Sequence, residues 1–278
     1  MEYTINVGGK LMDMSSPKVM GILNVTPDSF FSGSRKQTEQ EITERCNQII
    51  DEGGEIIDVG AFSTRPGAPE VSEAEEMDRL RNGLQILRRE QPDAVVSVDT
   101  FRPDVARMAV EEYGVAIVND VSEGGITGVV NKPLGWTQGD YPDMFRMVAR
   151  LGVPYILMSV KPTVEDMLMA FSREMQQLRD LGVKDIILDP GFGFGKTLDD
   201  NYRLMSEMDK LQVLGLPLLV GVSRKSMIFR LIGGDPTTSL NGTTVLHTIS
   251  LLKGGNILRV HDVKEAVECV RIFQKLKY

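Results

Sequence analysis

The chain has 278 residues and a mass of 30.8 kDa, with 42% hydrophobic and 25% charged side chains. This ordinary globular composition excludes a disordered or low-complexity chain and allows one large core. Thirty-one basic and 39 acidic side chains give a net charge of −8. A broad basic face for nucleic acid is therefore excluded, and any anionic ligand must be bound by a local cluster of cations.

Cysteine usage and the first residues predict the compartment. Cys46 and Cys269 lie far apart in the sequence and are expected to be free thiols, as in a cytoplasmic protein. The N-terminal residues show no basic stretch followed by an apolar run, and no segment reaches the about 18 consecutive apolar residues of a membrane helix. We therefore expect a cytoplasmic protein without an export signal, a membrane partner or a nucleic-acid partner.

Eight short apolar runs, rich in β-branched residues, recur along the chain and predict strands. They lie at residues 19–25, 55–60, 94–100, 115–121, 154–160, 185–191, 217–223 and 257–263. Such near-continuous apolar strands are typical of a parallel sheet covered on both faces. Segments with helical spacing lie between them, among others at 38–54, 72–90 and 163–183, with Thr38, Ser72 and Thr163 as predicted N-caps.

Eight strand-then-helix units predict a closed (β/α)8 TIM barrel, an α/β fold that typically takes about 250 residues. An open doubly wound sheet is the alternative, but the sequence lacks its nucleotide fingerprint. Residues 189–197, DPGFGFGKT, end like a P-loop, yet Pro190 stands where that motif needs a glycine and Lys196 where G-x-G-x-x-G needs its third. We expect a single domain over residues 1–278, with an N-terminal arm or hairpin (1–17) at the bottom of the barrel.

Polar residues gather at the predicted carboxyl ends of the strands, where barrels carry their chemistry. Asp99, Asn119 and Asp189 can accept hydrogen bonds from a planar donor edge, such as that of a 2-amino-pyrimidinone ring. Asn24 can reach a hydrated Mg²⁺, an ion usually held by one or two protein oxygens and substrate phosphates. A phosphate-type anion can be bound by a hydroxyl and four cationic groups: Thr64, Arg65, Lys225, Arg259 and His261. Three further strand-end residues can serve either the site or as helix N-caps: Asp58, Asp120 and Asp262.

Five motifs, in order from the first strand to the last, resemble those of the dihydropteroate synthase family. They are NVTPDSF (24–30), STRPG (63–67), DPGFGFGK (189–196), SRKS (223–226) and RVHD (259–262). The resemblance implies a transferase that joins 6-hydroxymethyl-7,8-dihydropterin pyrophosphate to 4-aminobenzoate, giving 7,8-dihydropteroate and pyrophosphate for folate synthesis. It further implies a Mg²⁺ cofactor, a homodimer and a sulfonamide target.

The resemblance also assigns roles to individual residues. It places the pterin ring at Asp99, Asn119, Asp189 and Lys225, and the pyrophosphate with Mg²⁺ at Asn24, Thr64, Arg259 and His261. It places 4-aminobenzoate at Arg65, Lys225 and Ser226, with Phe30, Pro66 and Phe192 or Phe194 as apolar walls. Asp28 is the candidate to stabilise the transient pterin cation of a dissociative substitution. Two loops, 26–36 and 61–70, are expected to close over bound pyrophosphate, so the pterin substrate should bind first.

Two positions depart from the family pattern. Ser159 stands where the family often has a histidine, and Phe62 where it usually has a glutamate. Two other functions use the same fold. A pterin-binding methyltransfer module would need only the ring contacts of Asp99, Asn119 and Asp189, and a non-catalytic barrel would need neither the anion-binding nor the metal-binding groups.

Overall fold

Eight parallel strands form the central sheet of the computed structural model, which describes residues 3–25, 32–62, 71–125 and 141–276. These strands are β3 (Lys18–Asn24), β4 (Ile56–Gly60), β5 (Val95–Asp99), β6 (Ile117–Asp120), β7 (Tyr155–Met158), β8 (Ile186–Asp189), β9 (Leu219–Val220) and β10 (Ile257–Val260). Their order is β8-β7-β6-β5-β4-β3-β10-β9. A parallel bridge between Leu188 and Leu218 joins the two ends of this order. The sheet thus closes, and the (β/α)8 prediction is confirmed.

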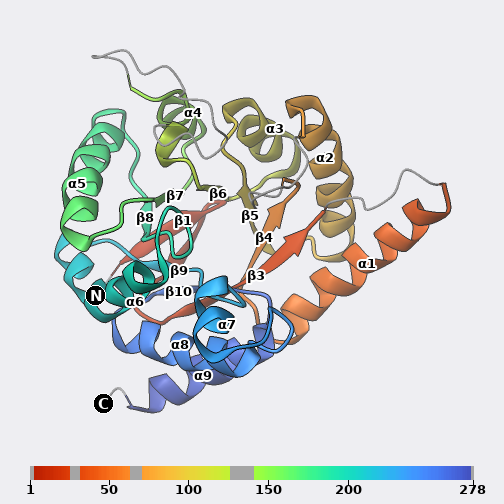
Figure 1. The fold of residues 1–278 in the computed structure, drawn as a ribbon. Coiled ribbons are helices and arrows are strands. Elements are labelled where there is room, and N and C mark those ends of the chain that lie inside the picture. Colours follow the sequence, from red (N-terminus) through yellow and green to blue (C-terminus); the bar gives the residue numbers. More distant parts are fainter. Residues whose placement is uncertain (1–2, 26–31, 63–70, 126–140, 277–278) are drawn as a thin grey trace.

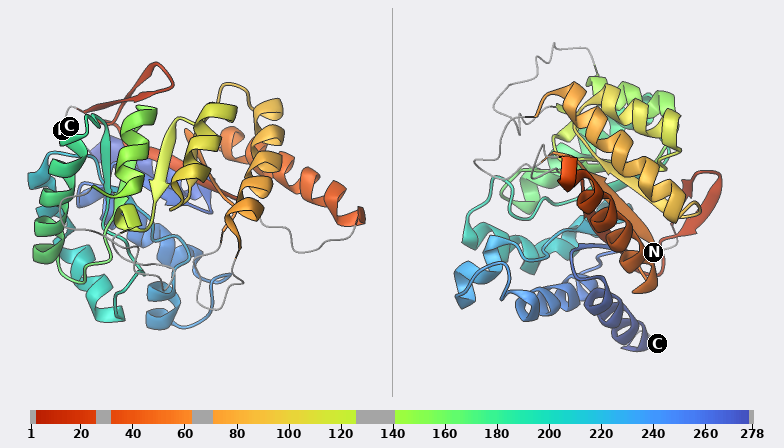
Figure 2. Two further views of the ribbon diagram at one scale, coloured as in Figure 1. Left: turned by 90° about the horizontal axis from the view of Figure 1, so that it is seen from above. Right: turned by 90° about the vertical axis from the view of Figure 1, so that its right-hand side faces the viewer.

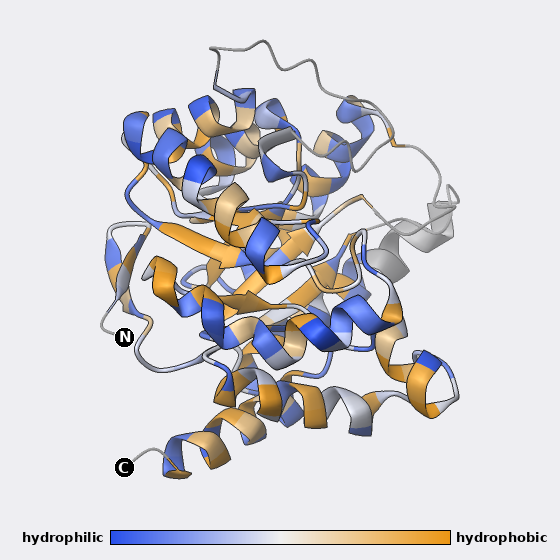
Figure 3. Cartoon of the chain, turned by 60° about the vertical axis from the view of Figure 1, so that its left-hand side comes forward, coloured by the Kyte–Doolittle hydropathy of each residue, from blue (hydrophilic) through white to orange (hydrophobic). Residues whose placement is uncertain are grey.

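Helices surround the barrel (Figure 1). They are α1 (Ser32–Asp51), α2 (Glu73–Glu90), α3 (Pro103–Tyr113), α4 (Asp143–Leu151), α5 (Val164–Asp180), α6 (Leu198–Glu207), α7 (Ser226–Ile232), α8 (Leu240–Leu252) and α9 (Val263–Leu276), with the 3-10 helices η1 (Glu123–Gly125) and η2 (Met208–Leu214). Their buried apolar residues form one core with those of the strands, and most of their polar residues lie on the outer surface (Figure 3). Within the described ranges, no helix combines the length and apolar composition needed to cross a bilayer.

Two of the three predicted N-caps begin their helices. The Ser72 hydroxyl accepts from the Glu75 amide and the Thr163 hydroxyl from the Asp166 amide, each over 3.2 Å. The prediction for Thr38 is wrong, because α1 already begins at Ser32. No proline or β-branched residue occurs between residues 32 and 37, and the cost of Gly33, about 1 kcal/mol, does not prevent the earlier start.

An N-terminal hairpin covers one end of the barrel. Strands β1 (Thr4–Val7) and β2 (Lys10–Asp13) pair antiparallel around Gly8 and Gly9, whose φ angles of 62° and 87° suit a two-residue hairpin turn. The hairpin projects beside the strand starts (Figure 2). Its apolar side chains join one buried layer with the first inward residues of the strands: Ile5, Val7, Met14, Met20, Ile56, Ile117, Ile156, Ile187, Leu219 and Ile257.

On five of the eight strands, the barrel interior becomes polar two residues further along. Because strand side chains alternate, position i+2 lies on the same face as position i, one step nearer the carboxyl end. These positions carry Asp58, Ser97, Asn119, Asp189 and Arg259. The apolar layer and the hairpin therefore form the stabilising end of the barrel, and the opposite end is built for a polar ligand.

Candidate active site

Four neighbouring strands place Asn24, Gly60, Asp99 and Asn119 in one row. Asn24 pairs with Gly60, Gly60 with Asp99, and Asp99 with Asn119 in the register of β3 to β6. A Cβ atom added at Gly60 would lie 3.5 Å from the Asp99 Cβ and 3.9 Å from the Asn24 Oδ1. Because Gly60 has no side chain, the side chains of Asn24 and Asp99 approach each other across it.

Arg259 joins this row to a second carboxylate inside the barrel. Its Nε donates to Asp58 Oδ2 and its Nη2 to Asp99 Oδ2, both over 2.6 Å, and the Asn119 amide donates to the same Asp58 oxygen over 3.1 Å. Desolvation acts to lower the Arg259 pKa, but the two carboxylates together raise it. Desolvation raises the pKa of Asp99 to about 7, against the opposing charge of Arg259. Asp58 therefore binds Arg259 and Asn119 inside the barrel and does not cap a helix.

Two buried acceptors in this cluster have no hydrogen-bond partner among the described residues. They are Asp58 Oδ1 and Asn119 Oδ1. Since nearly all buried polar atoms in folded proteins are hydrogen-bonded, such orphans mark a place for a donor from outside the chain. Two such acceptors on side chains that are hydrogen-bonded to each other can bind a planar group that carries several N–H donors.

Lys225 and Asp189 lie on the other side of the ring of strands. The Lys225 ammonium donates to the Phe192 carbonyl and lies 4.7 Å from the centre of the Phe194 ring. Desolvation lowers the pKa of Lys225 to about 8, and Asp189 opposes this effect. Desolvation also raises the pKa of Asp189, whose Oδ1 accepts from the Gly191 amide over 2.7 Å.

The aromatic prediction for this loop needs a correction. The Phe192 side chain is fully buried in the core between strands and helices, so its ring has no surface open to a substrate, and its carbonyl accepts from Lys225. Phe194 is partly exposed and carries the ring beside Lys225. Side chains of residues two apart can point to opposite sides of a glycine-rich loop, and sequence alone does not tell which ring faces the pocket.

The end of DPGFGFGKT holds the loop and not a phosphate. The Lys196 ammonium donates to the carbonyls of Ser159, Gly191 and Phe194 over 3.2, 3.0 and 3.1 Å, which uses its three N–H donors. Gly191 has a φ of 65°, and a side chain there would collide with the Ser159 carbonyl. Sequence reasoning missed this role of Lys196, since nothing in its neighbourhood distinguishes it from a surface lysine.

Asn24 and His261 line a cavity of about 300 Å³ together with Glu41, Ile42 and Arg45 of α1. The Arg45 guanidinium donates to the His261 carbonyl over 2.6 Å and to the Ile22 carbonyl over 3.2 Å. Arg45 is a second residue that the sequence did not reveal, because a cation on an amphipathic helix usually faces solvent. It adds positive charge beside the predicted anion site.

The remaining predicted residues divide into three groups. Ser226 is the first residue of α7. Asp120 is structural, because it accepts from the Ser122 and Gly124 amides and the Tyr155 hydroxyl, and Asp262 pairs with Arg224. Three predicted site residues and two predicted apolar walls lie outside the described residues: Asp28, Thr64, Arg65, Phe30 and Pro66.

The fold and the site define a barrel with buried carboxylates, amides and cations at its strand ends, a setting suited to a flat, donor-rich ring and an anion. Comparison with known proteins agrees, since the model of the pterin binding enzyme family matches residues 20–261. The dihydropteroate synthase of Escherichia coli K12 is 36% identical over 281 residues, covering 96% of this chain and 94% of that one. The chain therefore belongs to the dihydropteroate synthase family of pterin-binding enzymes.

Solved structures of the family match the fold as well. A dihydropteroate synthase from Xanthomonas albilineans with 4-aminobenzoic acid superposes with a TM-score of 0.86 at 31% identity, covering 100% of this chain and 99% of that one. One from Yersinia pestis, in a sulfonamide drug complex, gives a TM-score of 0.85 at 33% identity, with 99% of both chains covered.

Proposed function

We propose that this chain condenses 6-hydroxymethyl-7,8-dihydropterin pyrophosphate with 4-aminobenzoate to give 7,8-dihydropteroate and pyrophosphate. One observation carries the assignment of the ring site: the partnerless acceptors of Asp58 and Asn119 lie in the barrel with Asp99 and Asp189. The amino group and ring N–H of a 2-amino-pyrimidinone supply the donors that these oxygens need. The Lys225 ammonium would then donate to the carbonyl oxygen and a ring nitrogen of the pterin.

The reaction replaces one bond at the pterin methylene carbon. The bond from this carbon to the pyrophosphate oxygen breaks, and the oxygen keeps the electron pair. The positive charge that remains is delocalised into the pterin ring. The neutral amine of 4-aminobenzoate then bonds to the carbon and releases a proton. A neutral arylamine is already nucleophilic, so this chain's residues mainly stabilise charge.

Different residues are candidates to stabilise the leaving pyrophosphate anion and the pterin cation. Arg259 and His261, with Thr64, would bind the leaving pyrophosphate, and about a fifth of the Arg259 side chain remains exposed for this. Preorganised cations of this kind stabilise a departing anion without reorganising during the reaction. Asp28 is proposed to stabilise the pterin cation.

Mg²⁺ is proposed to bind with the pyrophosphate, through the Asn24 side-chain oxygen. Asn24 is exposed and lines the cavity, and its Oδ1 and the Asp99 Oδ2 would lie 3.9 and 3.8 Å from a Cβ atom at Gly60. Among the described residues, no three His, Cys, Asp or Glu side chains are grouped to hold a metal ion, so substrate oxygens would complete its shell. When bound, the ion supplies positive charge for the pyrophosphate oxygens.

The 4-aminobenzoate site is proposed to lie beside Lys225 and Ser226, with Arg65 for the carboxylate and Phe194, Phe30 and Pro66 as apolar walls. The partial exposure of Phe194 beside the Lys225 ammonium supports this placement. The pterin substrate would bind first. Equal 4-aminobenzoate affinity with and without bound pyrophosphate, measured by calorimetry, would contradict that order.

Pyrophosphate release tests the proposal directly. Purified protein with both substrates and Mg²⁺ should release pyrophosphate in step with dihydropteroate, and omission of either substrate or addition of a chelator should abolish release. A methyltransfer module would bind the pterin without releasing pyrophosphate. Folded protein that binds pterin but releases none would therefore reject the synthase and favour that module, and protein that binds neither substrate would favour a non-catalytic barrel.

The rate should fall on the alkaline side of pH about 8, because the charged form of Lys225 is lost as pH rises through its pKa. Each further pH unit leaves about tenfold fewer molecules with the ammonium, so kcat/KM for the pterin substrate should approach a tenfold fall per unit. Lys225→Arg should remove this alkaline limb, whereas Lys196→Arg should keep it. A profile that stays flat to pH 10 would refute the role of the Lys225 charge.

We further propose a cytoplasmic homodimer. Large apolar side chains are exposed on η2, α7, α8 and α9: Val213, Leu231, Ile232, Val245, Leu252, Ile272 and Leu276. A second copy that covered this surface would remove it from water. Cys46 and Cys269 are both free thiols, in keeping with a reducing compartment. Analytical ultracentrifugation over a range of protein concentrations would measure the proposed dimer.

A further inference from the structure

Arg224 has an unusual backbone conformation beside the proposed substrate sites. It lies in the turn between β9 and α7, and its φ of 53° falls in the left-handed region that residues other than glycine seldom occupy. Such a conformation persists where surrounding contacts hold it in place, and it often occurs at functional sites. The contacts of Arg224 are therefore informative.

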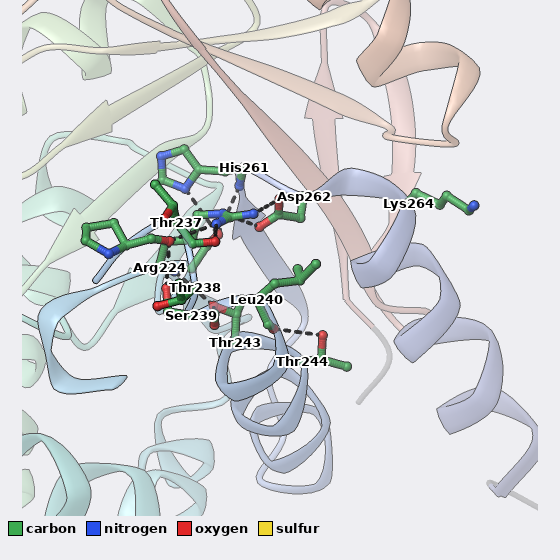
Figure 4. Close-up of polar contacts among 12 residues, drawn as sticks. Arg224, Thr237, Thr238, Ser239, Leu240, Thr243, Thr244, His261, Asp262 and Lys264 are labelled. Atoms are coloured by element: carbon green, nitrogen blue, oxygen red, sulfur yellow. Dashed lines mark hydrogen bonds and ion pairs between the residues drawn. The ribbon is translucent and has the colours of Figure 1, made fainter. Parts of the chain in front are cut away.

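Arg224 uses its backbone and its whole guanidinium to join three segments (Figure 4). Its amide donates to the Thr243 hydroxyl over 3.0 Å. Its Nε and Nη2 form a two-point ion pair with Asp262, both over 2.8 Å. Its Nη1 donates to the carbonyls of Pro236 and Thr237 over 2.7 and 3.0 Å. The planar fork of arginine allows this arrangement, and a lysine could not reproduce it.

The residues on either side of these contacts belong to the proposed site. Lys225 and Ser226 directly follow Arg224 in the turn, and His261 directly precedes Asp262. The Ser223 hydroxyl, on the other side of Arg224, accepts from the His261 amide over 3.1 Å and lies 3.1 Å from His261 Nδ1. The same turn thus fixes a lysine beside Phe192 and Phe194 and a histidine that lines the cavity of Asn24.

We infer that Arg224 is a positioning residue that couples the two substrate sites. Its left-handed backbone, held by Thr243, directs Lys225 and Ser226 toward the pterin and 4-aminobenzoate. Its ion pair with Asp262 holds the end of β10, and with it His261, at the pyrophosphate. Arg224 itself touches no substrate. This inference rests on the proposed synthase activity.

Two threonines of α8 make a matched test of the backbone contact. The Thr243 hydroxyl donates to the Ser239 carbonyl and accepts from the Arg224 amide, whereas the Thr244 hydroxyl only donates to the Leu240 carbonyl. Thr243→Val should raise the KM for 4-aminobenzoate by about tenfold, the equivalent of about 1.4 kcal/mol. Thr243→Ser keeps the hydroxyl and should keep the wild-type KM for 4-aminobenzoate. Thr244→Val should leave the KM values of both substrates unchanged.

A double-mutant cycle tests the ion pair. Asp262→Asn should raise the KM for the pterin pyrophosphate more than that for 4-aminobenzoate, and Arg224→Met should raise both. The double variant should have the same KM values as Arg224→Met, because both changes remove the same ion pair. All rates are measured well below the unfolding midpoint of the weakest variant. If Arg224→Met does not fold, the threonine variants and Asp262→Asn still test the positioning role of Arg224.

The outcomes separate this inference from the proposed function. A merely structural role for Arg224 would lower the amount of folded protein and leave both KM values as they are. Active wild-type protein with unchanged KM values in all variants would overturn the positioning role alone. Wild-type protein without activity would overturn the proposed function and this inference with it.

Discussion

Replacing Arg259 with glutamine should slow pyrophosphate release by about 10²–10³-fold, the usual cost of removing one preorganised charge from an active site. The same change should destabilise the fold, because Asp58 and Asp99 would lose the cation that neutralises them inside the barrel. Breaking a buried pair in this way typically costs about 3–5 kcal/mol. Steady-state release assays and urea unfolding would measure both effects.

An exposed arginine provides the control. Arg81 forms a two-point pair with Glu112, over 2.9 and 3.0 Å, on the helix surface. Arg81→Gln should change neither the release rate nor the unfolding midpoint, because solvent screens exposed pairs. Release by Arg259→Gln at the wild-type rate, from protein that is fully folded, would show that the pyrophosphate is bound elsewhere.

Asp189→Asn should weaken pterin binding and leave the fold intact. The Asp189 carboxylate would accept two hydrogen bonds from the ring, and each charged hydrogen bond contributes about 1.5–3 kcal/mol. Their loss in the variant should raise the dissociation constant of the pterin by about 10²–10⁴-fold. The asparagine oxygen can still accept from the Gly191 amide and keep the turn. The variant loses the desolvation cost of the carboxylate but also the charge that opposes the desolvation of Lys225, so its unfolding midpoint should stay close to that of the wild type.

Asp185 offers the matched control just before the same strand. Its carboxylate accepts from the Asn6 amide of the hairpin over 2.8 Å, at the opposite end of the barrel. Asp185→Asn should keep pterin affinity and affect only the hairpin contact. Calorimetric titration with a pterin, combined with thermal unfolding, would compare the two variants. Equal pterin affinity in both would contradict the role of Asp189.

The strand pattern made most of the fold predictable. Each of the eight apolar runs overlaps one strand, because a sheet covered on both faces needs apolar residues on consecutive positions. The pattern does not show pairing across the barrel. Nothing in the spacing of β4 and β10 tells that Arg259 meets Asp58, whose own position also suits a helix cap. Contacts of this kind depend on barrel closure and its stagger.

Single side chains of the site were harder to predict than its location. The choice between Phe192 and Phe194 depends on the path of a glycine loop, and the role of Lys196 depends on three carbonyls that are brought together only by folding. The structure also shows the contacts of Ser159 and Phe62, the two residues that depart from the family pattern. Ser159 contributes its carbonyl to Lys196, and the Phe62 ring packs edge-on to Phe101 at 5.3 Å.

The shortest strand of the barrel has a consequence for substrate binding. Strand β9 has two residues, and its junction with β8 depends on one bridge and on the 2.9 Å hydrogen bond from the Leu188 amide to the Pro217 carbonyl. Asp189 directly follows Leu188 on one side of this seam, and Lys225 follows β9 on the other. A pterin that bound to both residues, as proposed, would act as a cross-link over the most sparsely paired junction of the barrel. Substrate would thus complete a wall that the chain alone closes only sparsely, and the folded state would gain stability with its occupancy.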